Sequence, residues 1–353
     1  MTDAESVDVE AITEPKISLA RLSTPSFGDE VNEAELVLLA NRSIRARTRP
    51  GVVLFLWLWQ LVGAVFLAWP TAALVGQAYG NHPRGDAVLF EPGGLALADF
   101  VWRSRGFSGA LLAHDTIVAA FSVIAGLLPL AALLASIAYT TRARRSPRPR
   151  QLARFAFDAF GRMLGLLCIA GAVEVFFAGI AITLGGYVTD AVLARMGEAR
   201  ADQLGWLVTL LLFLVVLAVG VLHDLARASV VRFRVGALKA CALAWNTFRM
   251  HPVSLFGSWG WRACAGLVPI VAASMVTDRI GLRTGGSVVA IFVLHQLVVV
   301  TRVALRASWL ASALRAVDDA HRVTKSRATS LQRESERAAR SAEPDAPSHD
   351  PIA

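Results

Sequence analysis

Two residues of opposite charge lie deep within long apolar stretches of the chain. Glu174 comes eleven residues after Met163, and Arg262 comes nine residues after Val253, where these stretches begin. At about 1.5 Å of helix rise per residue, both side chains lie roughly 15 Å from the stretch ends. We therefore expect them to face each other. Such a pair can act as a proton or substrate relay, or it can neutralise two costly charges and fix helix register. Alternatively they make no contact, with Arg262 extending toward the membrane surface or Glu174 protonated.

A second charged group lies where the fourth and sixth apolar stretches end. His223, Asp224 and Arg227 are close in sequence, and Arg302 and Arg306 are one helical turn apart, so Asp224 can accept a hydrogen bond from either of the last two. We expect these five residues to form a polar cluster at the cytoplasmic face. A histidine beside an aspartate without a nucleophile is not a catalytic arrangement.

Other chemical signatures are missing from the sequence. It has no zinc-protease, Walker, serine-hydrolase or dinucleotide-binding motif. Its three cysteines form no Cys-x-x-Cys pair. We expect no enzymatic activity, no catalytic residues, no cofactor and no metal site.

The apolar stretches themselves are long enough to cross a membrane. About 20 apolar residues in a helix span roughly 30 Å of hydrocarbon. The hydrophobic fraction of 55% and the mean hydropathy of +0.52 favour lipid as the solvent. The predicted spans are residues 52–75, 117–139, 163–186, 206–222, 253–276 and 288–305. The expected fold is all-α, a polytopic transmembrane helix bundle of about six spans, with five or seven spans as alternatives.

Basic residues predict the orientation of this bundle. Of the 35 lysines and arginines, 27 fall in segments on one side of the predicted spans and seven on the other. The positive-inside rule places the richer side, with both termini, in the cytoplasm, and the protein in the inner (plasma) membrane. The net charge of +8 reflects this asymmetry and does not indicate nucleic-acid binding. Arginines at this face attract anionic lipid headgroups.

Three segments divide the chain. Residues 1–50 are expected to be a largely disordered cytoplasmic segment, residues 51–315 the six-span domain, and residues 316–353 a disordered, charged cytoplasmic tail. Amphipathic stretches at residues 152–163, 231–245 and 95–102 are expected to lie in the membrane interface or to extend the spans. Pro129 is expected to bend the second span, and Trp309 to belong to an interfacial belt of aromatic residues.

The segment from Ala237 to Pro252 is a basic amphipathic helix leading into a span. In this it resembles the corresponding element of uncharacterised bacterial six-helix inner-membrane families, including the membrane domain associated with glycerophosphodiester phosphodiesterases. The resemblance covers about residues 205–315 and concerns the layout of the helices. It implies no phosphodiesterase activity here, because the soluble catalytic domain is not in the sequence, and it transfers no functional residue.

Two kinds of function remain. The first is a non-enzymatic scaffold, assembly or partner subunit whose basic helices contact lipid or a membrane protein partner. The alternative is a small transporter or permease that uses the Glu174/Arg262 layer. A transporter needs a polar path between the two faces, and the external halves of the predicted spans are nearly free of polar residues. This pattern favours the first function.

Overall fold

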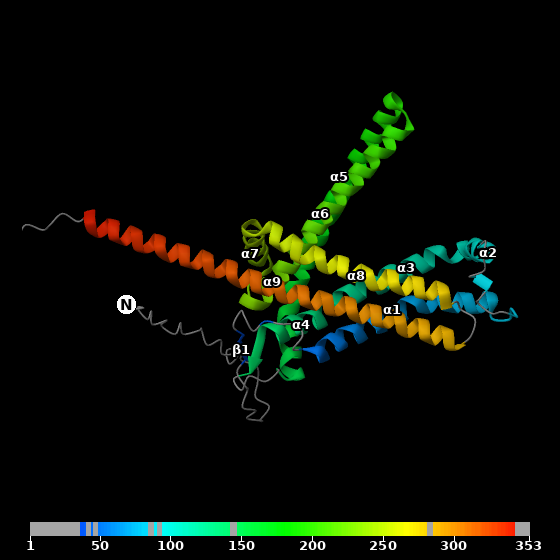
Figure 1. The fold of residues 1–353 in the computed structure, drawn as a ribbon, viewed down its shortest axis with the longest axis horizontal. Helices are drawn as coiled ribbons and strands as arrows, with labels where there is room; N and C mark the ends of the chain where they lie inside the picture. The colour runs from blue at the N-terminus through cyan, green and yellow to red at the C-terminus, as the bar shows by residue number, and fades with distance from the viewer. Residues whose placement is uncertain are drawn as a thin grey trace, which may run out of the picture.

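The computed structural model of the 353-residue chain describes residues 36–39, 44, 49–83, 88–89, 94–141, 147–280 and 285–342. Helices dominate these residues (Figure 1). The first half of the chain forms α1 (Pro50–Tyr79), α2 (Leu95–Arg103), η5 (Ser104–Phe107), α3 (Ser108–Ala125) and α4 (Leu127–Ala138). The second half forms α5 (Pro149–Met196), α6 (Glu198–Phe233), α7 (Ala237–Met250), α8 (Pro252–Ile280) and α9 (Gly285–Ala342).

Six helical segments are long and apolar enough to cross a membrane. They are Pro50–Tyr79, Leu95–Ala138, Pro149–Leu193, Glu198–Phe233, Pro252–Ile280 and Gly286–Arg337. The predicted all-α bundle with six spans is confirmed. All six exceed the roughly 20 residues that a bilayer requires, so their ends must continue outside the hydrocarbon.

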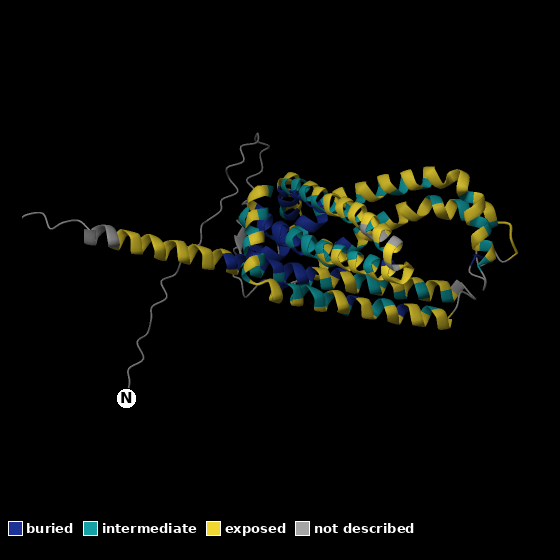
Figure 2. Ribbon diagram, turned by 90° about the horizontal axis from the view of Figure 1, so that it is seen from above, coloured by how far each residue is buried: buried dark blue, intermediate teal, exposed yellow. Residues whose placement is uncertain are grey.

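The extra length is packed together at the arginine-rich end of the bundle, which we call the base. It comprises α4, α7 and parts of three long helices, namely residues 152–166 of α5, 221–232 of α6 and 303–320 of α9. Figure 2 shows buried residues gathered at this end, while the apolar lengths of the spans stay exposed. This distribution suits a membrane protein, because acyl chains solvate apolar side chains along the spans and only the base must exclude water.

A two-stranded ribbon closes one side of the base. Strand β1 (Leu36–Leu38) pairs antiparallel with β2 (Tyr139–Thr141), and the Leu39 amide donates to the Ala138 carbonyl at 2.9 Å. This strand lies within residues 1–50, the segment that was expected to be largely disordered. Residues 1–35 of that segment lie outside the described residues.

Helices α5 and α6 form a hairpin that leaves the base in its own direction. Figure 1 shows this pair diverging from α1, α3, α8 and α9, which run together. Its outer part, residues 167–220, is called the arm below. The turn at the tip contains Gly197, whose φ of 82° is readily adopted only by glycine.

The second span breaks where proline interrupts its hydrogen bonding. Helix α3 ends at Ala125 and α4 begins at Leu127, two residues before Pro129, with Gly126 between the two helices. Pro129 cannot donate a backbone hydrogen bond, and its ring crowds the carbonyl four residues earlier, at Ala125. The Gly126 amide still bonds to Ser122, at 2.9 Å. The expected bend is thus a break between two helices.

The three predicted amphipathic stretches belong to different kinds of helix in the structure. Residues 152–163 belong to the continuous helix α5, whereas α7 is a separate helix that ends before His251 and Pro252. Residues 95–102 form α2, which packs against the end of α1, where the Tyr79 hydroxyl donates to the Ala96 carbonyl at 2.9 Å.

The predicted disordered tail is helical where the structure describes it. Helix α9 continues without interruption to Ala342 and extends beyond the base as a single exposed helix (Figure 1). Its residues Val317 and Ala320 are buried in the base, with exposures of 1% and 2%. Residues 343–353 lie outside the described part of the chain.

Candidate functional site in the base of the bundle

Asp224 is the buried centre of a charged cluster in the base. Its Oδ1 accepts hydrogen bonds from Arg227 Nη1 at 3.2 Å and from Arg306 Nη2 at 2.9 Å. Its Oδ2 accepts from Trp309 Nε1 at 2.9 Å. The aspartate is only 3% exposed. A carboxylate this buried is costly unless it is paired and hydrogen-bonded, and these three donors from α6 and α9 meet that need.

Helical spacing places these donors around the carboxylate. Arg227 lies three residues after Asp224, so both occupy one face of α6. Arg306 and Trp309 have the same spacing on α9. Trp309 is 2% exposed, so it is a buried hydrogen-bond donor and not part of an interfacial belt as predicted.

The structure joins three of the five predicted cluster residues. Asp224, Arg227 and Arg306 are in direct contact. His223 lines a separate apolar pocket of about 240 Å³ between α5, α6 and α7, together with Cys241 and Trp245. Arg302 is exposed and lies beside Gly266 of α8, without an ion pair to any described residue. Burial in the pocket wall raises the pKa of the Cys241 thiol.

A second buried ion pair lies on the other side of α9. Asp318 bonds to Arg232 of α6 at 3.0 Å and to Arg322, one turn further along α9, at 2.9 Å. Arg232 also donates to the Leu39 carbonyl at 3.0 Å and thereby connects the ribbon to the base. The sequence analysis missed this pair because it assigned Asp318 to the disordered tail.

A periodic signal for this part of the base was present in the sequence. Apolar residues recur at alternating spacings of four and three from near the predicted end of the sixth span onward, and all of them are buried: Val303, Ala307, Leu310, Leu314 and Val317. This spacing is typical of a helix with one buried face. It predicts that α9 continues into the base.

Arg262 has partners other than the predicted Glu174. Its Nη1 donates to the Ser258 carbonyl and hydroxyl at 2.5 and 2.6 Å, its Nε to Ser308 Oγ at 3.2 Å, and its Nη2 to Ser312 Oγ at 3.0 Å. No ion pair joins Arg262 to Glu174, although the structure describes both residues. The predicted contact is corrected accordingly.

Arg262 misses Glu174 because it lies closer to the base than its distance from Val253 suggests. Helix α8 begins at Pro252 within the base, so nine residues after Val253 bring Arg262 only to the level of Ser308 and Ser312. Those serines lie beyond Leu305, the predicted end of the sixth span. Glu174 sits instead on α5 in the arm, where its carboxylate interacts electrostatically with Arg227.

A second arginine shares the hydroxyl groups that Arg262 uses. Arg315 Nη2 donates to Ser312 Oγ at 3.1 Å, so two guanidinium groups meet on one oxygen atom. Neither arginine forms an ion pair with a carboxylate among the described residues. Two positive charges this close repel each other by roughly 2 to 3 kcal/mol near a protein surface. This arginine pair is therefore an uncompensated positive site.

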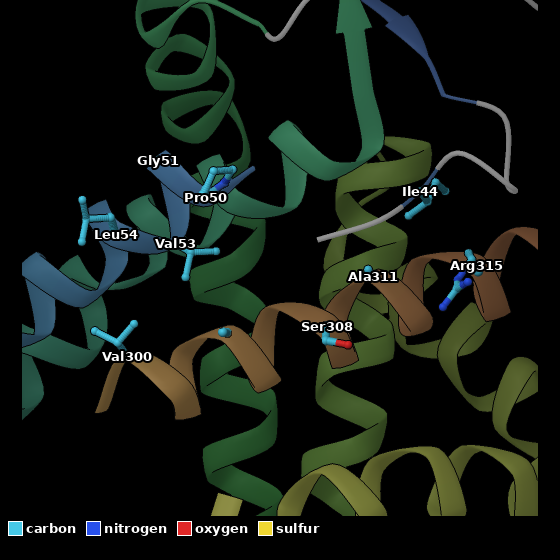
Figure 3. Close-up of a pocket in the computed structure, with 10 residues that line it drawn as sticks. Ile44, Pro50, Gly51, Val53, Leu54, Val300, Ser308, Ala311 and Arg315 are labelled. Carbon is cyan, nitrogen blue, oxygen red and sulfur yellow. The ribbon is translucent and has the colours of Figure 1, made fainter. Parts of the chain in front are cut away.

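A cavity of about 860 Å³ opens beside the pair, between α1 and α9. Figure 3 shows Arg315 near one end of the cavity and Leu54 and Val300 near the other. Apart from Arg315 and Ser308, the side chains that line it are apolar. The cavity thus has one polar end and one apolar end.

The described residues contain no group of three or more His, Cys, Asp or Glu side chains that could hold a metal ion. The chemistry that the base offers is ion pairing and hydrogen bonding. Comparison of the chain with protein-family models, with curated proteins and with solved structures gives no match.

Proposed function

We propose that the protein is a non-enzymatic partner or scaffold subunit of the inner membrane, with both termini and the base in the cytoplasm. The observation that carries this proposal is the separated arm. Helices α5 and α6 pack against each other there, and Figure 1 shows no other described helix running alongside them. Only 6% of the most apolar window of each helix is buried. A protein partner can therefore reach both sides of the hairpin.

The base supports the same proposal. Its buried carboxylates are already bonded to arginines that hold α6 and α9 together, with Asp224 on Arg306 and Asp318 on Arg232. Contacts of this kind make the base a rigid support for the arm. The transporter alternative depended on a Glu174/Arg262 layer, and these two residues have other neighbours.

Site-specific photo-crosslinking in intact cells tests the proposal. Ile182 of the arm is 73% exposed, and a photoreactive residue there is expected to crosslink to one discrete protein. The same protein is expected to copurify with the chain when no photoreactive residue is present. The matched control position is Phe66 of α1, which is 64% exposed, and lipid adducts are expected there. If Ile182 yields lipid adducts alone, as Phe66 does, the arm has no protein partner and the proposal fails.

A further inference from the structure

The base holds an uncompensated pair of arginines next to a cavity that is polar at one end and apolar at the other. We infer that this is a binding site for one phospholipid of net negative charge, whose phosphate lies against Arg315 and Ser308 and whose acyl chain follows the apolar cavity between α1 and α9. The site is independent of any partner that the arm binds.

The unused hydrogen-bond donors of Arg315 indicate that it binds an anion. A guanidinium group has five N–H donors, and Arg315 uses one of them on Ser312. No carboxylate of a described residue pairs with it. A phosphate presents several oxygen atoms, and charge-assisted contacts between arginine and phosphate are among the stronger hydrogen bonds in proteins.

Arg262 strengthens the site from behind. It does not line the cavity, but it donates to Ser308 and to Ser312, which lie between it and Arg315. Its charge therefore adds to the positive potential at the polar end. Arg262 acts as a positioning residue for the Ser308 hydroxyl, which itself lines the cavity (Figure 3).

The apolar end of the cavity indicates that the anion belongs to a lipid. Val53 and Leu54 of α1 and Val300 and Ala304 of α9 form its walls. A free phosphate ion gains nothing from such walls, whereas an acyl chain gains favourable burial along them. The polar end also lies at the level of Ser308, just past the apolar part of the sixth span, where phospholipid headgroups are located.

Native mass spectrometry of the full-length protein tests the site. The protein is purified in detergent and mixed with equal amounts of phosphatidylglycerol and phosphatidylcholine. Wild-type protein is expected to retain one phosphatidylglycerol molecule with a preference of about tenfold. Arg315→Gln is expected to abolish the preference. Arg302→Gln removes an exposed arginine from the same helix, and this control is expected to behave like wild type.

Two further variants separate the possible sources of the anion. Ala304→Phe fills the apolar cavity, so it is expected to reduce lipid retention as strongly as Arg315→Gln. Inorganic phosphate alone is then titrated against wild type and Ala304→Phe. Phosphate binding that is equal in both proteins, with no enrichment of phosphatidylglycerol, would identify a soluble-anion site and overturn the inference.

The remaining outcomes are equally decisive. Equal losses for Arg302→Gln and Arg315→Gln would show that only general surface charge attracts the lipid, and the site would be rejected. Arg262→Gln is expected to weaken the preference by a smaller factor than Arg315→Gln. Because Arg262 bonds to three serines and its replacement can disturb packing, thermal unfolding of each variant is measured first. Arg315→Gln breaks one hydrogen bond, to Ser312, and carries the test if Arg262→Gln does not fold.

Discussion

The Asp224 carboxylate accepts hydrogen bonds from three side chains on two helices, and it supplies the only negative charge in contact with Arg227 and Arg306 among the described residues. Its role follows from burial. In water the same aspartate would gain little from one arginine, because exposed ion pairs contribute at most about 1 kcal/mol. In the base, Asp224 joins Arg227 of α6 to Arg306 of α9, so removal of that one charge affects both contacts.

Asp224→Asn is expected to lower the free energy of unfolding by about 3 kcal/mol, because it removes the direct carboxylate partner of Arg227, whose side chain is only 11% exposed, and breaks the link from α6 to Arg306. The measurement is the thermal unfolding temperature in detergent. Asp99→Asn is the control, since Asp99 pairs with Arg103 on an exposed face of α2, and its effect is expected to stay within about 1 kcal/mol. Equal effects of the two substitutions would show that Asp224 does not organise the base.

The exchange of charges between Glu174 and Arg262 gives a second test at this scale. The double variant Glu174→Arg with Arg262→Glu is expected to accumulate no better than the worse of the two single variants. The reason is that Arg262 bonds to Ser308 and Ser312, whereas Glu174 belongs to the arm. Recovery of wild-type levels in the double variant, measured by quantitative immunoblotting of membranes, would contradict these contacts.

At the scale of elements, α9 combines three roles in one uninterrupted helix. Its first part crosses the membrane, its middle part supplies buried residues and Asp318 to the base, and its last part is exposed. Stability from tertiary packing is therefore concentrated before about residue 322. The exposed turns beyond it contribute little, because most helical stability in proteins comes from burial of one face.

Truncation separates the packed part of α9 from the exposed part. Removal of residues 324–353 is expected to leave the thermal unfolding temperature within a few degrees of the wild-type value, since this part is exposed wherever the structure describes it. Removal of residues 316–353 also deletes Val317 and Asp318, and this truncated protein is expected to be unstable or not to accumulate. Equal stability of the two truncated proteins would place Val317 and Asp318 outside the core.

At the scale of the whole molecule, the base and the spans are stabilised by different solvents. The base buries its apolar residues against one another, whereas the spans expose theirs along most of their length (Figure 2). Lipid can solvate the exposed lengths only if all six spans cross the bilayer with the base on one side. The even number of spans then places residue 49 and the end of α9 on the same side.

Sided cysteine labelling tests this topology. On a background in which Cys168, Cys241 and Cys264 are replaced by alanine, Ser335→Cys is expected to react with a membrane-impermeant maleimide only in inverted vesicles. Ser108→Cys, at the start of α3, is expected to react only in right-side-out vesicles. Both positions are exposed in the structure, so access depends on the bilayer and not on burial. Labelling of Ser335→Cys from the outside would reverse the proposed orientation.

The sequence by itself determined the class of fold, the number of spans and the side of the spans on which the arginines gather. These properties depend on residues that are close in sequence, because a window of about 20 apolar residues selects lipid wherever its neighbours lie. The helical stripe from Val303 to Val317 also depends only on residues that are close in sequence, although the predicted boundary at residue 315 divided it between the six-span domain and the tail.

Only the tertiary structure decided which charges meet. The depth of Arg262 depended on where α8 begins relative to α9, and the separation of Glu174 from Arg262 depended on the direction in which the arm leaves the base. Position along one helix fixes neither its rotation nor its offset from the next helix. For this reason Asp224 with Trp309, Asp318 with Arg232, and Arg262 with Arg315 became visible only when the helices were packed together.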